Sequence, residues 1–154
     1  MKIRIVCAGK IKEKWLNDGI AEYVKRLSKY AKVEFVEVPD SPDSLPVAKA
    51  LEQEGRLMLS KISDSDHVWV LDLHGKLLTS EELSDKLMTG LERGGSTLTV
   101  VIGGSNGLFE ELTERANERI CLGKITLTHQ MTRLVILEQL YRGFKIASNE
   151  KYHK

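Results

Sequence analysis

The sequence has few of the features that mark secreted, metal-binding or membrane proteins. Only two cysteines are present, Cys7 and Cys121, and they lie far apart and outside any CxxC spacing. This argues against a disulfide framework and a cysteine metal site, so both thiols are expected to be buried as small apolar residues. No apolar run approaches the roughly 18 residues of a membrane span, and the first apolar stretch breaks at Gly9, too early for a secretory signal. We therefore expect a cytoplasmic protein with no membrane and no metal among its partners.

Two common nucleotide-binding fingerprints are also missing. The segment after the first expected strand reads Cys7-Ala8-Gly9-Lys10 and contains no GxGxxG, and no GxxxxGK[ST] occurs anywhere in the chain. These absences argue against an ordinary dinucleotide-binding dehydrogenase, a Rossmann-type methyltransferase and a P-loop enzyme.

The composition is that of an ordinary globular protein. The 154 residues are 42% hydrophobic and 29% charged, which suits a single domain over residues 1–154. The net charge is only +1, but residues 124–154 carry +4 and the remainder −3. A basic C-terminal end is typical of proteins that bind a polyanion such as nucleic acid, although a solvated charged face would give the same pattern.

Apolar residues alternate between strand and helix periodicity along the whole chain. Strands are predicted at residues 2–8, 33–38, 67–73, 97–102 and 119–122, and helices at 13–30, 47–62, 79–92, 108–117 and 130–147. Thr79 and Glu82 form a capping-box signature, and His74-Gly75-Lys76 is expected to end the third strand. All three prolines fall in a loop at 39–46. The interleaved order predicts an α/β fold with a mostly parallel sheet flanked by helices.

Three loops are expected to meet at one edge of this sheet. In parallel α/β sheets, ligands bind beyond the carboxyl ends of the strands, which here carry residues 71–75, 103–107 and 122–128. The second loop reads Gly103-Gly104-Ser105-Asn106-Gly107 and precedes a helix. Glycines allow a ligand to approach the backbone, so a nucleotide or adenosine contact is one interpretation. A tight strand-to-helix turn is the other.

The last helix and the tail carry two further patterns. Leu134-Val135-Ile136-Leu137 covers most directions around the helix axis, which indicates either a homodimer interface or a helix buried within its own domain. Residues 148–154 form a polar tail of a kind that is usually disordered. This tail contains Tyr152-His153 between lysines, a pair that offers stacking, hydrogen bonding and a titratable ring. His129, just before the last helix, is a further polar candidate beside the expected loops.

Four segments taken together resemble one known family. They read VIGGSNGL at 101–108, LTHQMTR at 127–133, LYRGFKI at 140–146 and YHK at 152–154. In this order, and in a chain of this length, they are similar to the ribosomal RNA large subunit methyltransferase H family of the SPOUT superfamily. The similarity runs from the first strand to the last residue. One departure is Thr128, where the family is expected to have Pro, and this change is expected to loosen the start of the last helix.

The resemblance implies a knotted SPOUT-type fold, with a trefoil knot in the C-terminal half, and a homodimer. It implies S-adenosyl-L-methionine as cofactor, and methylation at N3 of a pseudouridine in 23S rRNA within the assembled ribosome. The cofactor-binding residues that it implies are Leu71, Gly103, Gly104, Leu122, Gly123, Lys124, Ile125, Thr126 and Leu127. These residues fall in the three strand-end loops that the sheet argument selects.

The resemblance also guides the choice of residues for catalysis and RNA binding. The catalytic candidates are His129, Arg142, Tyr152 and His153, and the RNA-binding candidates are Arg133, Lys151 and Lys154. In this hypothesis Arg142 positions a phosphate or a uracil carbonyl, and the other catalytic candidates supply polar and acid–base groups, with the general base left open. The tail is expected to lie over a cofactor pocket, in its own subunit or in the partner. Two alternatives remain: a non-catalytic RNA- or ribosome-binding module, and a small-molecule α/β enzyme such as a nucleotide hydrolase.

Overall fold

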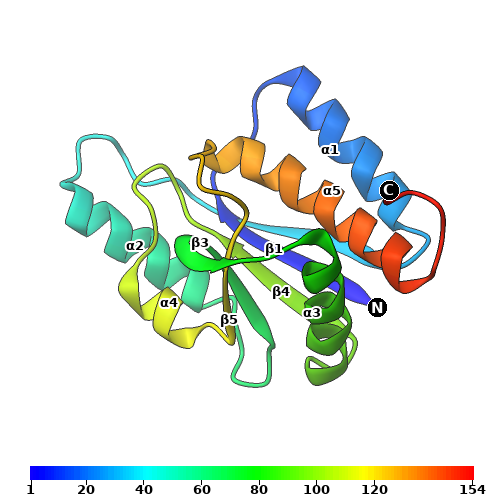
Figure 1. Ribbon diagram of the computed structural model, residues 1–154. Coiled ribbons are helices and arrows are strands. Elements are labelled where there is room, and N and C mark those ends of the chain that lie inside the picture. Colours follow the sequence, from blue (N-terminus) through cyan, green and yellow to red (C-terminus); the bar gives the residue numbers. More distant parts are fainter.

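Five strands and five helices alternate along the chain in the structure, a computed structural model that describes all 154 residues (Figure 1). The elements are β1 (Lys2–Ala8), α1 (Lys14–Leu27), β2 (Lys32–Val38), α2 (Val47–Leu59), β3 (Val68–Leu77), α3 (Ser80–Arg93), β4 (Thr97–Ile102), α4 (Glu110–Arg115), β5 (Glu118–Cys121) and α5 (His129–Ala147). The strands form one sheet in the order β2-β1-β4-β3-β5, and every pair is parallel. The predicted α/β fold with a parallel sheet flanked by helices is confirmed.

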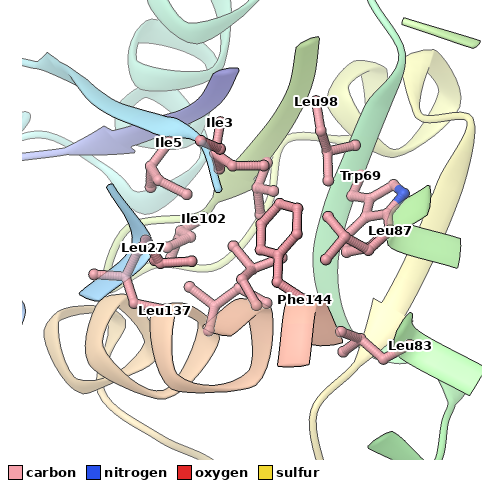
Figure 2. Close-up of a cluster of buried hydrophobic side chains, with 14 of the residues drawn as sticks. Ile3, Ile5, Leu27, Trp69, Leu83, Leu87, Leu98, Ile102, Leu137 and Phe144 are labelled. Carbon is pink, nitrogen blue, oxygen red and sulfur yellow. The ribbon is translucent and has the colours of Figure 1, made fainter. Parts of the chain in front are cut away.

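Helices cover both faces of the sheet. α1, α3 and α5 lie on one face, and α2 and α4 lie on the other (Figure 1). Successive strand residues point to opposite faces, so β1 sends Ile3 and Ile5 into one core and Val6 and Ala8 into the other. The central strands are therefore buried on both sides, which is why their apolar runs are nearly continuous. Figure 2 shows the larger core, in which Phe144 of α5 lies among side chains of the sheet.

β3 is longer than the sequence predicts. The prediction that residues 74–76 end this strand is wrong, because its pairing continues to Leu77. Ile120 of β5 pairs with both Leu71 and Lys76. Two partners cannot occupy the same edge of one strand residue, so β3 lies beside one edge of β5 at Leu71 and beside the other edge at Lys76.

Gly75 stands where these two stretches of chain cross. A Cβ at this position would lie 2.7 Å from the carbonyl carbon and oxygen of Arg119 in β5. Backbone atoms cannot turn aside as the end of a side chain can, so a larger residue would force the two segments apart. Residues 72–77 therefore pass directly over β5, and the close approach requires glycine.

Two helices begin with side-chain caps. At the start of α3, Glu82 N–H donates to Thr79 Oγ1 at 3.1 Å and Thr79 N–H donates to Glu82 Oε2 at 2.8 Å, so the predicted capping box is confirmed. At the start of α5, Met131 N–H donates to Thr128 Oγ1 at 3.1 Å. The expectation that Thr128 loosens this start is wrong, because its hydroxyl satisfies a free helix N–H that a proline side chain could not.

α5 is largely enclosed within its own chain. It packs between α1 and α3 on the sheet, and none of its residues from His129 to Ile146 is exposed. Ile136, Leu137 and Leu140 are completely buried. The predicted burial on more than one side is confirmed, and the domain itself supplies much of the cover.

Cys7 and Cys121 are free, buried thiols, as the sequence predicts. Burial raises the pKa of the Cys7 thiol to about 11. No helix combines the length and the apolar character needed to cross a membrane. No three His, Cys, Asp or Glu side chains gather closely enough to hold a metal ion.

Candidate functional site

The three predicted ligand loops lie side by side at the carboxyl edge of the sheet. β4, β3 and β5 are neighbours, and Leu71 of β3 pairs with Ile102 and with Ile120. Gly103 follows Ile102 directly, and Leu122 comes two residues after Ile120. The predicted meeting of the three segments is therefore confirmed for Leu71, Gly103 and Leu122, whereas residues 72–75 belong to β3 and do not form the expected loop.

The glycine loop, residues 103–107, closes on itself. Gly107 N–H donates to the carbonyl oxygen of Gly104 at 3.0 Å, and Gly107 has a φ of 97°. A Cβ on Gly103 would lie 2.5 Å from the carbonyl oxygen of Gly107. The glycines are thus needed for the turn itself, which confirms the tight-turn interpretation. The same lack of side chains leaves the backbone open to a ligand.

The loop after β5 presents apolar side chains to solvent. Ile125 is 82% exposed and Leu127 is 38% exposed, whereas Leu122 packs partly on the larger core. Lys124 and Thr126 are exposed as well. Exposed aliphatic side chains next to an open glycine loop are suited to cover a flat apolar ring or a partner chain.

A hollow of about 650 Å³ lies at the opposite, amino edge of the sheet. None of its ten lining residues is hydrophobic, and Lys2, Arg4 and Arg93 are among them. A cofactor that carries an adenine ring needs apolar surface around that ring. This polar hollow is therefore not suited to such a cofactor, and the carboxyl edge is.

Arg133 is a structural residue rather than an RNA-binding one. Its Nη1 donates to Glu37 Oε2 at 2.8 Å, and its Nη2 donates to the carbonyl oxygens of Ala8 and Gly9 at 2.9 and 2.8 Å. Only 2% of the residue is exposed. The prediction that Arg133 contacts RNA is wrong, because its guanidinium is inside the protein and ties α5 to the ends of β1 and β2.

Arg142, Tyr152 and His153 do come together, on α5 and against the first turn of α3. The Arg142 guanidinium lies over the Tyr152 ring at 4.7 Å from its centre, and both side chains donate to Glu138 Oε1, at 2.6 and 3.1 Å. The His153 ring lies between two partners, with Nδ1 3.4 Å from Arg142 Nη1 and Nε2 2.7 Å from Glu81 Oε1. These three predicted catalytic residues, with their partners Glu138 and Glu81, form one hydrogen-bonded group, the tail cluster.

The environment of Tyr152 decides its protonation. Burial raises the pKa of its phenol to about 12, and hydrogen bonding with Tyr23 and the carboxylate of Glu138 act in the same direction. At neutral pH the phenol therefore keeps its proton and acts as a hydrogen-bond donor, not as a base. Arg142, hydrogen-bonded to the same carboxylate, has a raised pKa and stays charged.

Glu150 fixes the tail to the body of the protein. Its carboxylate accepts hydrogen bonds from Tyr30 Oη at 2.6 Å, Lys145 Nζ at 2.8 Å and Lys29 Nζ at 3.1 Å. These bonds, that of Lys145 first, lower the pKa of Glu150 to about 2. The tail is therefore attached to the body of the protein, as expected for a functional tail and not for a disordered one, and the side chains of Lys151 and Lys154 remain exposed.

The tail cluster and His129 lie at opposite ends of α5. His129 is the first residue of α5, and Arg142 lies thirteen residues further along the helix, a separation of about 20 Å at 1.5 Å per residue. In Figure 1 the C-terminus lies beside α1, past the far end of α5 and away from its start. The predicted catalytic residues therefore divide into two groups, with His129 at one end of α5 and the tail cluster at the other.

Sequence reasoning missed the acidic members of the tail cluster. Glu138 lies four residues before Arg142 on the same helix, which is the spacing of a helical ion pair and could have been noticed. Glu81 reaches His153 from α3, 72 residues away in sequence, and no local pattern signals that contact.

Comparison with known proteins places the chain in a family. The family described as "Predicted SPOUT methyltransferase" matches residues 1–153. Proteins named "Ribosomal RNA large subunit methyltransferase H" from Enterococcus faecalis and Bacillus cytotoxicus are each 49% identical to this chain over 159 residues, and one from Lactobacillus delbrueckii subsp. bulgaricus is 50% identical. In each case the match covers all of both chains. The chain therefore belongs to the SPOUT methyltransferase family.

Proposed function

We propose that this protein transfers a methyl group from S-adenosyl-L-methionine to N3 of a pseudouridine in 23S rRNA, within the assembled ribosome. The observation that carries this proposal is the end-to-end match, at about half identity, with proteins named for methylation of large-subunit ribosomal RNA. Such a substrate would place the protein in the cytoplasm. The exposed lysines of the tail, Lys151 and Lys154, would meet the RNA phosphates.

The loops at the carboxyl edge fit the proposed cofactor. Ile125 and Leu127 are exposed and would pack on the adenine, while the backbone of residues 122–127 would hydrogen-bond its polar edge. The turn at Gly103 and Gly104 would lie beside the remainder of the molecule, and its glycines let Gly107 O and Glu54 Oε2 pack directly on the loop. When bound, the cofactor supplies an electrophilic methyl group, so the protein's task is to align the nucleobase and remove one proton.

The tail cluster would perform that task. Arg142 is held by Glu138 and would hold a uracil carbonyl or an adjacent phosphate. The Tyr152 phenol, with its pKa raised to about 12, would donate a hydrogen bond to the base rather than take its N3 proton. This leaves His129 and His153 as candidates for proton removal, and His153 has a carboxylate, Glu81, on its Nε2.

We propose further that two chains build each active site. Arg142 in the tail cluster is separated by roughly 20 Å of α5 from His129, which comes two residues after Leu127, the last cofactor residue. Methyl transfer needs reacting atoms about 3 Å apart. A homodimer that places the tail of one protomer over the cofactor loops of its partner would satisfy this need. Exposed Trp15, Leu73 and Ile125 would find cover in such an interface.

A trefoil knot is the third part of the proposal. The passage of residues 72–77 over β5, with Gly75 at the crossing, supports it. Knots are rare exceptions among protein topologies, and a crossing of two chain segments inside one sheet is a step that most α/β folds lack.

The function is tested by mass mapping of 23S rRNA from cells that lack the protein. We expect one pseudouridine to lose a single methyl group, and the purified protein with S-adenosylmethionine to restore it on ribosomes isolated from those cells. An unchanged methylation map would contradict the proposed function.

The two-chain site is tested by mixing two inactive variants. One variant ends at Ser148 and lacks the tail; the other is Gly103→Val, in which the new side chain would strike the carbonyl of Gly107 and distort the cofactor loop. Mixed dimers combine an intact loop from the first variant with an intact tail from the second, so mixing should restore activity. If the site lies within one chain, the mixture stays inactive.

A further inference from the structure

A buried carboxylate stands directly beside the glycine loop. Glu54 of α2 is only 6% exposed, and its Oε2 packs so closely on Gly104 that a Cβ there would lie 2.5 Å from it. Gly104 also lies close to Ala8 at the end of β1. The carboxylate therefore faces the part of the loop that is furthest from β5 and from the apolar residues 122–127.

Glu54 is held in this position from both sides. Its Oε1 accepts a hydrogen bond from the backbone N–H of Ser41 at 3.0 Å, and Ser41 Oγ in turn donates to the carbonyl of Ala50 in α2. The next residue, Gly55, has no side chain, which lets the ring of Phe109 pack directly on α2. These contacts seat the helix against the segment that follows the glycine loop and leave the carboxylate little freedom to move.

The charge of Glu54 has no counterpart in the protein. No Lys, Arg or His lies within ion-pair distance of it, and no donor in the protein reaches its Oε2. The buried Arg133 at the same edge shows the usual solution, since Glu37 neutralises it. Oε2 is not among the buried atoms that lack a partner, so it can be reached from outside the protein. A largely buried carboxylate without a cation costs stability, and this oxygen can accept a hydrogen bond from a bound cation.

We propose that Glu54 binds the α-ammonium group of the amino-acid portion of the cofactor. This inference rests on the proposed function, because it takes S-adenosylmethionine to be the ligand of this edge. The ammonium is the group that offers both N–H donors and a positive charge. The sulfonium has no N–H or O–H to donate, and the ribose hydroxyls carry no charge.

The position of Glu54 agrees with this assignment. The adenine is expected at the loop after β5, and β5 and β4 are separated by one strand, or about 10 Å at 4.8 Å per strand. A cofactor that extends from β5 along the edge would therefore bring its amino-acid end to Gly104 and Glu54. In this role the residue fixes the orientation of the cofactor, and hence of the methyl group.

Calorimetry with two unreactive ligands tests the proposal. The ligands are S-adenosylhomocysteine and its analogue without the α-amino group, each titrated into the parent protein and into Glu54→Gln. The glutamine is nearly the same size and can still accept from Ser41 N–H. S-adenosylhomocysteine should bind the variant about 10- to 100-fold more weakly than the parent, the range of a hydrogen bond between charged groups. The analogue should bind both proteins equally.

The outcomes separate this inference from the proposed function. Equal weakening of both ligands in Glu54→Gln, or no weakening of either, would overturn the ammonium contact. If the variant fails to fold, the parent alone decides, because S-adenosylhomocysteine must bind it more tightly than the analogue does. Failure of the parent to bind S-adenosylmethionine would instead overturn the proposed function. Glu52→Gln, at an exposed position on the same helix, is the matched control and should bind both ligands like the parent.

Discussion

The two ends of α5 each carry an arginine paired with a glutamate, and the pairs differ in what surrounds them. Arg133 lies 2.8 Å from Glu37 with a side chain 3% exposed, and its remaining hydrogen bonds go to backbone carbonyls. Arg142 lies 2.6 Å from Glu138 with a side chain 24% exposed, and its other neighbours are Tyr152 and His153. The first pair fastens secondary structure together, and the second gathers groups that can act on a ligand. Burial and the nature of the remaining partners distinguish a structural cation from a functional one, where pairing alone does not.

Removal of the tail should have the largest effect, because it takes away the groups around Arg142 and leaves those around Arg133 in place. A chain that ends after Ser148 keeps every cofactor segment and all of α5, but loses Tyr152 and His153. Methyl transfer to ribosomes should fall by about 10²–10⁴-fold, the usual contribution of positioned acid–base groups. Binding of S-adenosylmethionine, measured by calorimetry, should largely survive.

A second variant shows whether the loss of activity comes from the tail cluster or from the exposed lysines. Lys151→Ala with Lys154→Ala keeps the tail cluster and removes only exposed charge, so it should weaken ribosome binding more at low salt than at high salt and leave the chemical step intact. Methylation at the parent rate by the truncated chain would remove Tyr152 and His153 from the active site.

Replacing each arginine by alanine in turn should lower mainly the stability in one variant and mainly the activity in the other. Arg133→Ala leaves the carbonyls of Ala8 and Gly9 without donors, and we expect a loss of about 2–4 kcal/mol in the free energy of unfolding, measured in urea. Arg142→Ala removes a partly exposed ion pair and should cost less than about 1 kcal/mol, while methyl transfer falls about 100-fold or more through lost alignment. Equal effects of the two changes on stability would contradict the distinction between the two ends.

Much of the fold follows from local patterns in the sequence. The five strands, the parallel sheet and the convergence of three loops can be predicted because apolar periodicity, prolines and the Thr79–Glu82 box are local signals. The extension of β3 to Leu77 cannot be predicted in this way. It depends on a crossing with Arg119, more than 40 residues later, and the only local sign is Gly75.

The candidate site shows the same division between local and distant contacts. The tail cluster is predicted in part, because Arg142, Tyr152 and His153 are close in sequence, but Glu81 and the anchoring of Glu150 by Tyr30 come from distant elements. Arg133 was misassigned for a related reason. Its helix position gives no sign that Glu37 and two strand-end carbonyls lie opposite it.

The smallest expected effect concerns Glu150, which holds the tail end in place through charge. The pKa of this carboxylate is lowered from 4.5 to about 2 by Lys145, Tyr30 and Lys29. The folded state therefore binds fewer protons than the unfolded state, so the stability that Glu150 contributes is fully present above about pH 4.5 and is lost as the pH falls through about 2. Glu150→Gln removes this titration, and its tail should be attached more weakly than that of the parent at neutral pH.

Hydrogen exchange of the amides of residues 149–153 measures this attachment directly. Exchange in Glu150→Gln should be faster than in the parent at pH 7. The difference should shrink as the pH falls from about 4.5 toward 2, because protonation then neutralises Glu150 in the parent, as the substitution already has in the variant. Glu22→Gln is the matched control, since Glu22 makes only an exposed helical pair with Arg26 and should leave exchange in the tail unchanged. A difference between Glu150→Gln and the parent that stays constant over this range would mean that packing of Tyr152 on Tyr141 and Arg142, rather than the charge of Glu150, holds the tail.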